Sequence, residues 1–499
     1  MTQAVDNLAL LPAYLAAGTA VLVLLADLLV ARRGVTVATA LLGALGTATA
    51  AGFAAAGPVR ATFCGGLPAA LGATPPDCSY VADRRAALIA LLFALLTAGV
   101  LALAAPALAA GAAPVGEFCF LLACAMTGGV VLGAAGDLIT LIVALETLTL
   151  PLYVLVGLRR RAVASAEAAV TFFVVSVVAT AVALLGAALI YADTGAVHLD
   201  LLAAGPATPS PATERLGRVG VVLLLVGLAF KVAAVPLHAW APATYDGAPL
   251  PVAAYLSTAS KLGGAVAIIY VVVGALRPWA QVSGVVLAGL AVLTMTVGNV
   301  VALRQTRMVR LLAWSSVAQA GYILAPLGAA AVDAGRTGDA GTTAVATALT
   351  YTVFFVLLEL AAFAAVVALR APGADGGRIA DYRGAARRHP WVGAALVLAL
   401  VGLAGLPPGL AGLFAKVAVV RSLLGGGAGW LALAVALNAV IGLAYYLRVA
   451  TTLYGRRTDD AADGRARVPW PVAATLGAAT LVAIVVGFAP QLVLDATAW

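Results

Sequence analysis

The three lysines of this chain are its most chemically informative residues. Lysine and arginine together number 29, and the three lysines all lie inside hydrophobic segments long enough to cross a membrane. Arginine keeps its proton in proteins, whereas a lysine in apolar surroundings can lose it near neutral pH. A cation at the centre of a bilayer costs about 2.5–3.5 kcal/mol, which predicts a compensating role for each one. These candidate proton carriers are Lys231, Lys261 and Lys416.

Two acids inside hydrophobic segments are candidate partners for these lysines. Glu146 lies in the middle of its segment and is predicted to pair with one of them. Such a pair is worth about 4 kcal/mol at about 4 Å and an effective dielectric of about 20. A purely structural ion pair is the alternative. Glu359 has no obvious partner nearby in the sequence, so it is either protonated or extends a polar axis between Lys261 and Lys416.

Two further interpretations concern position along a helix. His238 follows Lys231 by seven residues, which on a continuous helix places both on roughly one face. His238 is therefore a candidate relay, with a packed core histidine as the equal alternative. Lys416 lies nearer the end of its segment, where its stem could instead reach the headgroups.

The composition predicts an all-α integral membrane protein that positions these groups. The chain of 499 residues is 63% hydrophobic and 10% charged, with a mean hydropathy of +1.08. About fourteen apolar runs are each long enough to span a bilayer, and backbone groups in lipid must be satisfied within helices. We expect a single polytopic domain over residues 1–499, with helices 1–3 in residues 1–110 and helix 14 in residues 470–491.

An internal similarity predicts two inverted repeats of five helices. Helix 7, expected at 217–239, and helix 12, expected at 391–422, each carry a lysine with proline close by. Counting the predicted loops indicates that these two helices cross the membrane in opposite directions. Repeats with interrupted helices are a common transporter plan, with ion sites near the midplane. We therefore expect helices 4–8 in residues 115–275, helices 9–13 in residues 280–448, and breaks in helices 7 and 12.

The arginines predict orientation rather than an anionic partner. In a fourteen-helix arrangement the arginine-rich loops all fall on one side, which is predicted to be cytoplasmic, with both termini outside. The net charge of +8 therefore does not indicate nucleic acid. The N-terminus lacks a basic leader and is not expected to be a cleavable signal peptide. The loop arginines include Arg32, Arg33, Arg159, Arg160, Arg161, Arg304, Arg307, Arg310, Arg378, Arg383, Arg387 and Arg388.

The cysteines and the missing motifs limit the chemistry further. Cys64 and Cys78 share the loop between helices 2 and 3, where a disulfide and two free thiols are equally compatible with the sequence. Cys119 and Cys124 lie within helix 4 and are interpreted as packing residues. The chain carries no phosphate-binding loop, dinucleotide fingerprint or metal-spaced cluster, so we expect no cofactor and no metal in it.

Several motifs carry a resemblance to a known family. The segment 231–242 reads Lys-Val-Ala-Ala-Val-Pro-Leu-His-Ala-Trp-Ala-Pro, and the others are 245–252, 260–261, 298–305, 312–322 and 405–416. The chain resembles the proton-pumping, antiporter-like subunits of respiratory complex I, the bacterial NADH-quinone oxidoreductase. Helices 4–13 carry the likeness best.

The resemblance implies roles for matching positions. Glu146 would pair with Lys231, Lys261 would be the central lysine, and Lys416 would end the outward path. Lysine at position 416 favours the subunit N branch of the family over subunit M, which usually carries glutamate there. The family's location is the bacterial inner membrane, with neighbouring subunit M and the small subunits at the quinone end as partners. NADH, FMN, iron–sulfur clusters and quinone would all belong to partner subunits.

Two positions depart from the family, and two alternatives stay open. Thr171 stands where members often carry a lysine, and Glu359 stands where asparagine is common. A subunit of a multisubunit cation/proton antiporter would share the lysine axis. A structural subunit that does not conduct protons would lack a polar chain between the lysines.

Overall fold

Long apolar helices form almost the whole of the computed structural model, which describes residues 5–65, 77–159, 162–205, 211–456 and 467–498. Eleven of the helical spans in these ranges are long and apolar enough to cross a membrane, so the predicted class of fold is confirmed. The helices are α1 (Leu11–Val30), α2 (Arg33–Ala56), α3 (Arg84–Ala109), α4 (Val115–Gly133), α5 (Leu138–Gly157), α6 (Val163–Thr194), α7 (Leu199–Ala204), α8 (Pro211–Lys231), α9 (Trp240–Gly247), α10 (Leu250–Tyr255), α11 (Lys261–Val273), α12 (Ala280–Ala302), α13 (Met308–Leu324), α14 (Ala340–Leu369), α15 (Ala385–Arg388), α16 (Pro390–Ala404), α17 (Leu410–Gly425), α18 (Gly429–Tyr454), α19 (Trp470–Phe488) and α20 (Gln491–Thr497).

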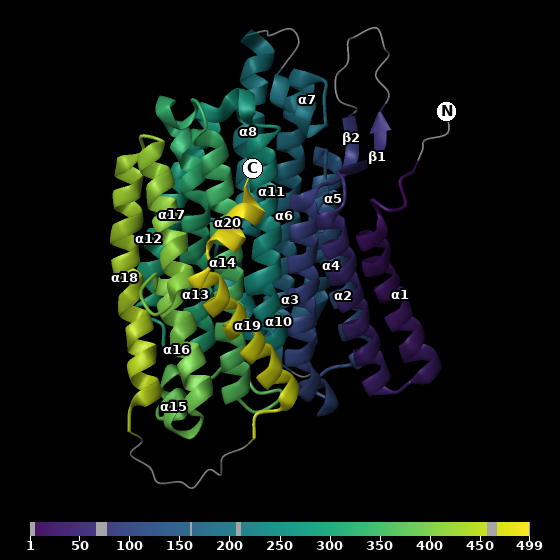
Figure 1. The fold of residues 1–499 in the computed structure, drawn as a ribbon, viewed down its shortest axis with the longest axis vertical. Helices are drawn as coiled ribbons and strands as arrows, with labels where there is room; N and C mark the ends of the chain where they lie inside the picture. Colours follow the sequence, from purple (N-terminus) through teal and green to yellow (C-terminus); the bar gives the residue numbers. More distant parts are fainter. Residues whose placement is uncertain (1–4, 66–76, 160–161, 206–210, 457–466, 499) are drawn as a thin grey trace.

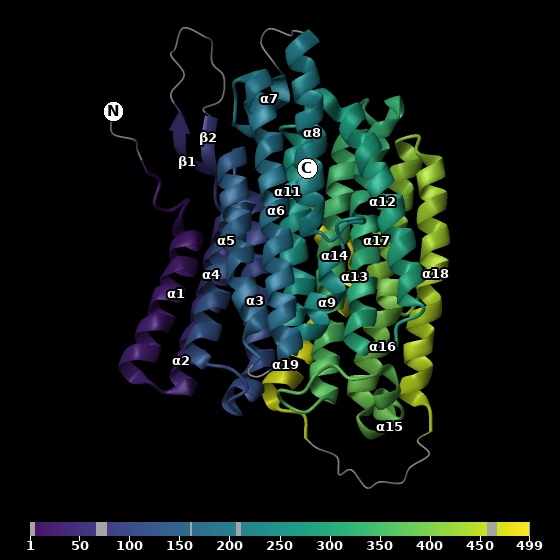
Figure 2. The same ribbon diagram turned by 180° about the vertical axis from the view of Figure 1, so that it is seen from behind.

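The helices stand side by side as one bundle. In both views α1 and α18 lie on opposite flanks, with α11 and α14 between them (Figure 1, Figure 2). Helices α11 and α14 are the most buried, because 83% of the window in the span 250–273 and 78% of that in α14 lie inside the structure. The centre of the bundle is therefore the place where a buried polar side chain is best shielded from lipid.

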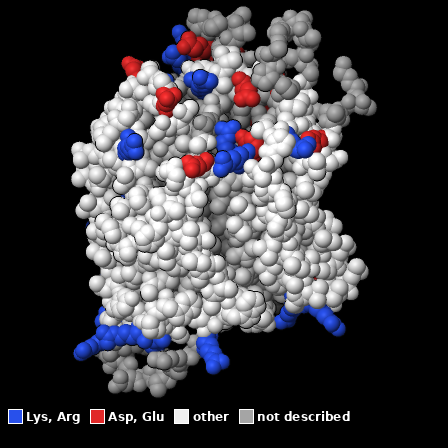
Figure 3. All heavy atoms as spheres, viewed as in Figure 1, with Lys and Arg blue, Asp and Glu red and all other residues white. Residues whose placement is uncertain are grey.

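Arginine side chains gather at one end of the bundle, the lower end in Figure 3. This end is formed by the α5–α6, α12–α13 and α14–α16 connections, and we call it the arginine-rich end. The opposite end carries the hairpin of β1 (Arg60–Gly65) and β2 (Asp77–Ala82) (Figure 1). Cys64 and Cys78 form a disulfide across this hairpin, so the bridge is present and the free thiols are not.

The two segments predicted to break do so in the same way. Helix α8 ends at Lys231 and α16 ends at Ala404, each followed by a residue in the left-handed region, Ala233 at φ 54° and Gly405 at φ 82°. The amide of the next residue donates five residues back, from Ala234 to Ala229 O at 2.9 Å and from Leu406 to Val401 O at 3.1 Å. This hydrogen-bond pattern is a common helix ending, and it leaves nearby carbonyls without helical partners inside the membrane.

The break in the first segment corrects the expected position of His238. Because α8 ends at Lys231, the chain between them is not helical and the two residues do not share a helix face. His238 is half-buried, with Nδ1 3.2 Å from Pro236 O and its ring centroid 5.0 Å from that of Trp314. The seven-residue spacing predicted a shared face only on an unbroken helix.

Candidate functional site

The predicted ion pair joins Lys231 to Glu146 at a separation of 2.6 Å between Nζ and Oε1. The lysine side chain is 4% exposed and the glutamate side chain 21%. The same ammonium donates to Thr149 Oγ1 and Ser176 Oγ, both at 3.1 Å. All three donor positions of the ammonium are thus occupied, which is what a buried charge requires.

Side chains from α5, α6 and α8 form this Lys231–Glu146 site. Glu146 and Thr149 stand three residues apart on α5, where an interval of three or four residues places side chains on one face. Ser176 and Thr180 repeat that spacing on α6, and Thr180 Oγ1 donates to Glu146 Oε1 at 2.5 Å. Helix α5 begins at Leu138, and Asp137 caps it by accepting from Thr140 N at 2.7 Å.

Lys261 is bound by the broken end of α8. Its ammonium donates to the carbonyl of Val232 and, at 3.4 Å, to that of Ser316. Only 1% of its surface is exposed. The carbonyl end of a helix carries partial negative charge, so it stabilises a cation in this position.

Lys416 makes the equivalent contact with the broken end of α16. Its ammonium donates to Ala404 O at 2.7 Å and lies 4.7 Å from the centroid of the Tyr322 ring. In both broken segments the accepting carbonyl belongs to the residue just before the left-handed one, Val232 before Ala233 and Ala404 before Gly405. The Lys416 side chain therefore points into the bundle and does not extend to the headgroups.

Glu359 is completely buried on α14. Ser257 Oγ donates to its Oε1 at 2.6 Å, and within the described ranges its Oε2 has no hydrogen-bond partner. Ser257 lies four residues before Lys261 in the chain, and α14 packs against α11, so Glu359 and the central lysine lie in one packed region. The acid that lacked a sequence neighbour thus belongs with the central lysine.

Sequence reasoning missed a chain of polar side chains between Lys261 and Lys416. Ser315 and Tyr446 share a hydrogen bond of 2.5 Å, and Gln319 Nε2 donates to the Tyr446 hydroxyl at 3.1 Å and to Leu403 O at 3.0 Å. Tyr351 OH donates to Gln319 Oε1 at 2.5 Å. The available signal was helical spacing, since positions 315, 319 and 322 place polar groups on one face of α13.

A second polar cluster adjoins this chain of side chains. Asn299 Nδ2 donates to the Tyr322 hydroxyl at 3.3 Å and to Asn438 O at 3.1 Å, while Tyr445 OH donates to Asn299 Oδ1 at 3.1 Å. Tyr322 thus connects the Lys416 ammonium, through its ring, to a buried amide pair. Inside a membrane, hydrogen-bonded polar side chains of this kind can form a pathway for protons, which the surrounding hydrocarbon does not offer.

Two cavities flank the buried polar groups at opposite ends of the bundle. A polar cavity of 510 Å³ at the arginine-rich end is lined by residues including Glu167, Thr171 and Asp246. A threonine cavity of 800 Å³ at the other end is lined by a row on α14, at positions 343, 347 and 350, and by Arg421 and Ser422 on α17. Within the described residues, no three His, Cys, Asp or Glu side chains come together as metal ligands would.

Comparison with known proteins gives a consistent family. The family model for the transmembrane region of NADH:quinone oxidoreductase and Mrp antiporter matches residues 135–442. NADH-quinone oxidoreductase subunit N of Salinispora tropica is 66% identical, over all of this chain and 99% of the relative. A chain of respiratory complex I from Thermus thermophilus with bound aureothin superimposes with a TM-score of 0.76 at 29% identity, covering 98% of this chain and 99% of that one. The Mrp complex of a Dietzia species shares the fold, with a TM-score of 0.79 at 22% identity over 98% and 96% of the two chains.

Proposed function

This chain belongs to the NADH-quinone oxidoreductase subunit N family, and we propose that it moves protons across a bacterial membrane as part of that complex. Quinone reduction in neighbouring subunits would drive the movement by rearranging charge along the membrane arm. The single observation that carries the proposal is the position of two lysines at one helix end. Lys231 is the last residue of α8 and pairs with Glu146, and Lys261 binds the carbonyl of the next residue along the chain, Val232.

The route begins at the polar cavity. Protons enter between α6 and α9, where Thr171 lines the cavity five residues before Ser176 on α6. A threonine hydroxyl can pass a proton along a hydrogen bond, although it does not hold a charge as a lysine would. Lys231 and Glu146 receive the proton, and opening of their contact releases it toward Lys261.

The second half of the route runs from Lys261 to Lys416. Glu359 balances the central lysine, and the hydroxyl and amide groups of Tyr446 and Gln319 bridge part of the interval to α16. Lys416 then delivers the proton to the threonine cavity, which Phe414 and Val417 on the same helix help to line. Closed ammonium–carboxylate contacts hold a charge in place, and their separation moves it, so the paired groups titrate as coupled units. His238 stays a candidate relay beside this route.

We further propose fourteen membrane crossings in one polytopic domain, with inverted repeats of helices 4–8 and 9–13. The similar ends of α8 and α16 support the repeat, since each presents the carbonyl just before its left-handed residue to a lysine, which lies on α11 in the first case and on α17 in the second. The arginine-rich end faces the cytoplasm in this proposal, and both termini lie outside.

Partner subunits complete the enzyme. One-fifth of the Glu146 side chain is exposed, on a surface where Val143 and Leu150 of α5 are 59% and 50% exposed. A carboxylate beside lipid is costly, so we propose that a neighbouring membrane subunit covers this surface. Subunit M and the small subunits near the quinone end are the proposed neighbours. In this proposal NADH, FMN, iron–sulfur clusters and quinone all belong to partner subunits of the complex.

The test is proton pumping by the assembled complex carrying Lys231→Met or Glu146→Gln. Each variant is expected to assemble, to oxidise NADH and to move fewer protons per electron pair. Glu214→Gln is the matched control, because Glu214 pairs with Arg218 on the same helix but in an exposed place, with side chains 52% and 58% exposed. An unchanged proton-to-electron ratio in both variants would show that Lys231 and Glu146 are not part of the proton route.

A further inference from the structure

An apolar cavity of 330 Å³ opens at the arginine-rich end, beside the polar cavity of the proposed proton route, and Arg159 lines both cavities. It lies where the ends of α3 and α14 meet the beginnings of α10 and α19. Leu103, Phe118, Leu250, Val367 and Val472 are among its lining side chains. The volume lies within the range of about 300–1,000 Å³ that is typical of ligand pockets.

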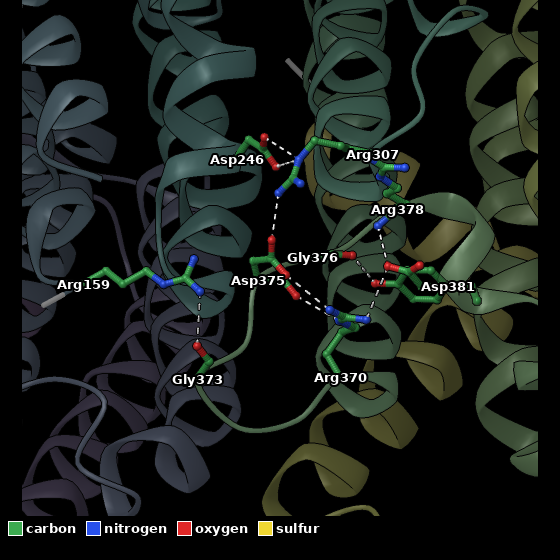
Figure 4. A network of polar contacts seen from close by, with 10 residues as sticks. Arg159, Asp246, Arg307, Arg370, Gly373, Asp375, Gly376, Arg378 and Asp381 are labelled. Atoms are coloured by element: carbon green, nitrogen blue, oxygen red, sulfur yellow. Dashed lines mark hydrogen bonds and ion pairs between the residues drawn. The ribbon is translucent and has the colours of Figure 1, made fainter. Parts of the chain in front are cut away.

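Among the described residues, two charged side chains line this cavity, Arg159 and Arg370. Arg370 is already neutralised, because its Nη2 lies 3.2 Å from Asp375 Oδ1 and its Nη1 3.8 Å from Asp381 Oδ2. Arg159 approaches the same loop from α5 and donates to the backbone carbonyl of Gly373 at 3.4 Å (Figure 4). Among the described residues Arg159 forms no ion pair, so its guanidinium is available to an anion at the cavity mouth.

Other cations surround the opening. Arg33 Nη1 donates to Ala109 O at 3.3 Å, one residue beyond the part of α3 that lines the cavity. Arg467 is exposed and lies two residues before Pro469, which lines the cavity at the start of α19. The cavity therefore combines an apolar interior with a positively charged rim at the end of a membrane bundle.

These properties fit an amphiphile with an anionic head. An apolar cavity does not hold ordered water well, because water there finds no polar partners. A guanidinium matches the oxygens of a phosphate, and basic pockets between membrane helices on the cytoplasmic side are suited to anionic headgroups. We propose that one acyl chain of an anionic phospholipid occupies this cavity and that its phosphate binds Arg159. The lipid would fill the junction of α3 and α10 with α14 and α19.

The experiment uses the whole complex, delipidated in detergent and incubated with phosphatidylglycerol that carries a photoreactive acyl chain. Crosslinks are expected on peptides from the lining segments of α3 and α19. Arg159→Gln should lower this crosslinking about fivefold, which corresponds to about 1 kcal/mol for one arginine near a lipid surface. Ala107→Trp, which places an indole in the cavity, should abolish it. Arg387→Gln is the matched control, since Arg387 also donates to one backbone carbonyl at this end, that of Tyr454 at 3.0 Å.

The competing outcomes are distinguishable. Equal crosslinking by the phosphatidylcholine analogue would overturn the role of the phosphate. Full competition by inorganic phosphate would identify a free anion site in place of a lipid site. Crosslinking unchanged by Arg159→Gln and Ala107→Trp would overturn the proposal altogether, whatever proton pumping shows.

Discussion

Arg307 connects three segments of the chain at the arginine-rich end, and removing it should destabilise the structure in a pH-dependent way. Its Nε lies 2.9 and 2.7 Å from the two carboxylate oxygens of Asp246, and its Nη2 lies 2.9 Å from Asp375 Oδ2. Figure 4 shows the chain of contacts continuing from Asp375 to Arg370 and Asp381. Asp246 lies in the last turn of α9, Arg307 directly precedes α13, and Asp375 lies in the connection after α14.

The expected loss of stability depends on how far the carboxylate partners of Arg307 are exposed to solvent. Exposed ion pairs are worth about 0.2–1 kcal/mol, and hydrogen bonds to charged groups about 1.5–3 kcal/mol when better shielded. The Asp246 side chain is 18% exposed and makes two hydrogen bonds with Arg307. The Asp375 side chain is 37% exposed and would still pair with Arg370 after Arg307 is replaced. Arg307→Gln should therefore cost about 2 kcal/mol, most of it from Asp246.

The pH dependence has a definite sign. The Arg307 side chain beside Asp375 holds the pKa of that carboxyl below its usual range. A depressed carboxyl contributes stability above its unfolded pKa of about 3.9, and that stability is lost as the pH falls through the folded value. The part of the difference between wild type and Arg307→Gln that comes from Asp375 should thus be full at neutral pH and shrink at a pH below about 4.

Thermal unfolding of the purified complex, followed by tryptophan fluorescence, measures this difference. The variant should melt a few degrees below wild type at neutral pH. Arg307→Lys, which keeps the charge but not the planar fork, should fall between them. The reasoning fails if Arg307→Gln melts like Arg387→Gln, or if its deficit persists unchanged in acid.

Three further changes test other parts of the structure. Gly405→Ala should lower both stability and pumping, because position 405 has φ 82° and an added Cβ would lie 2.5 Å from Lys416 Cδ. Tyr446→Phe removes the hydroxyl that binds Ser315 and Gln319, so proton pumping should fall several-fold while assembly persists. Replacing Cys64 and Cys78 by serine should expose the hairpin to proteases, since closing a loop of this 14-residue separation is worth about 3 kcal/mol, yet pumping should stay at the wild-type level.

Matched controls accompany these variants. Gly289→Ala adds the same methyl group where no atom of the described residues lies within 4 Å, so it should be neutral. Tyr454→Phe removes a hydroxyl from a residue that is 48% exposed, and pumping should not change. Equal losses in variant and control would assign the effect to general damage. A protease pattern unaffected by loss of the cysteines would show that strand pairing alone holds the hairpin.

Much of the site was predictable because, in lipid, the sequence around a charged residue largely determines whether that residue is buried. A lysine about ten residues inside a membrane-spanning segment has no aqueous position to occupy, so Lys231 and Lys261 were expected to be buried. Proline cannot continue a helix, which predicted the interruptions that expose the carbonyls of Val232 and Ala404.

Only the tertiary structure decided which groups meet. Hydrophobic pattern reports that a face is buried but not which helix covers it. Ser257 and Glu359 are 102 residues apart in the chain, and Gln319 and Tyr446 are 127 apart. Their contacts depend on how α13, α14 and α18 pack, and the lysine at 261 reaches Val232 only because α8 ends beside α11. The sequence by itself determined which charges lie in the membrane, whereas the packing of distant helices determined the partners that make those charges usable.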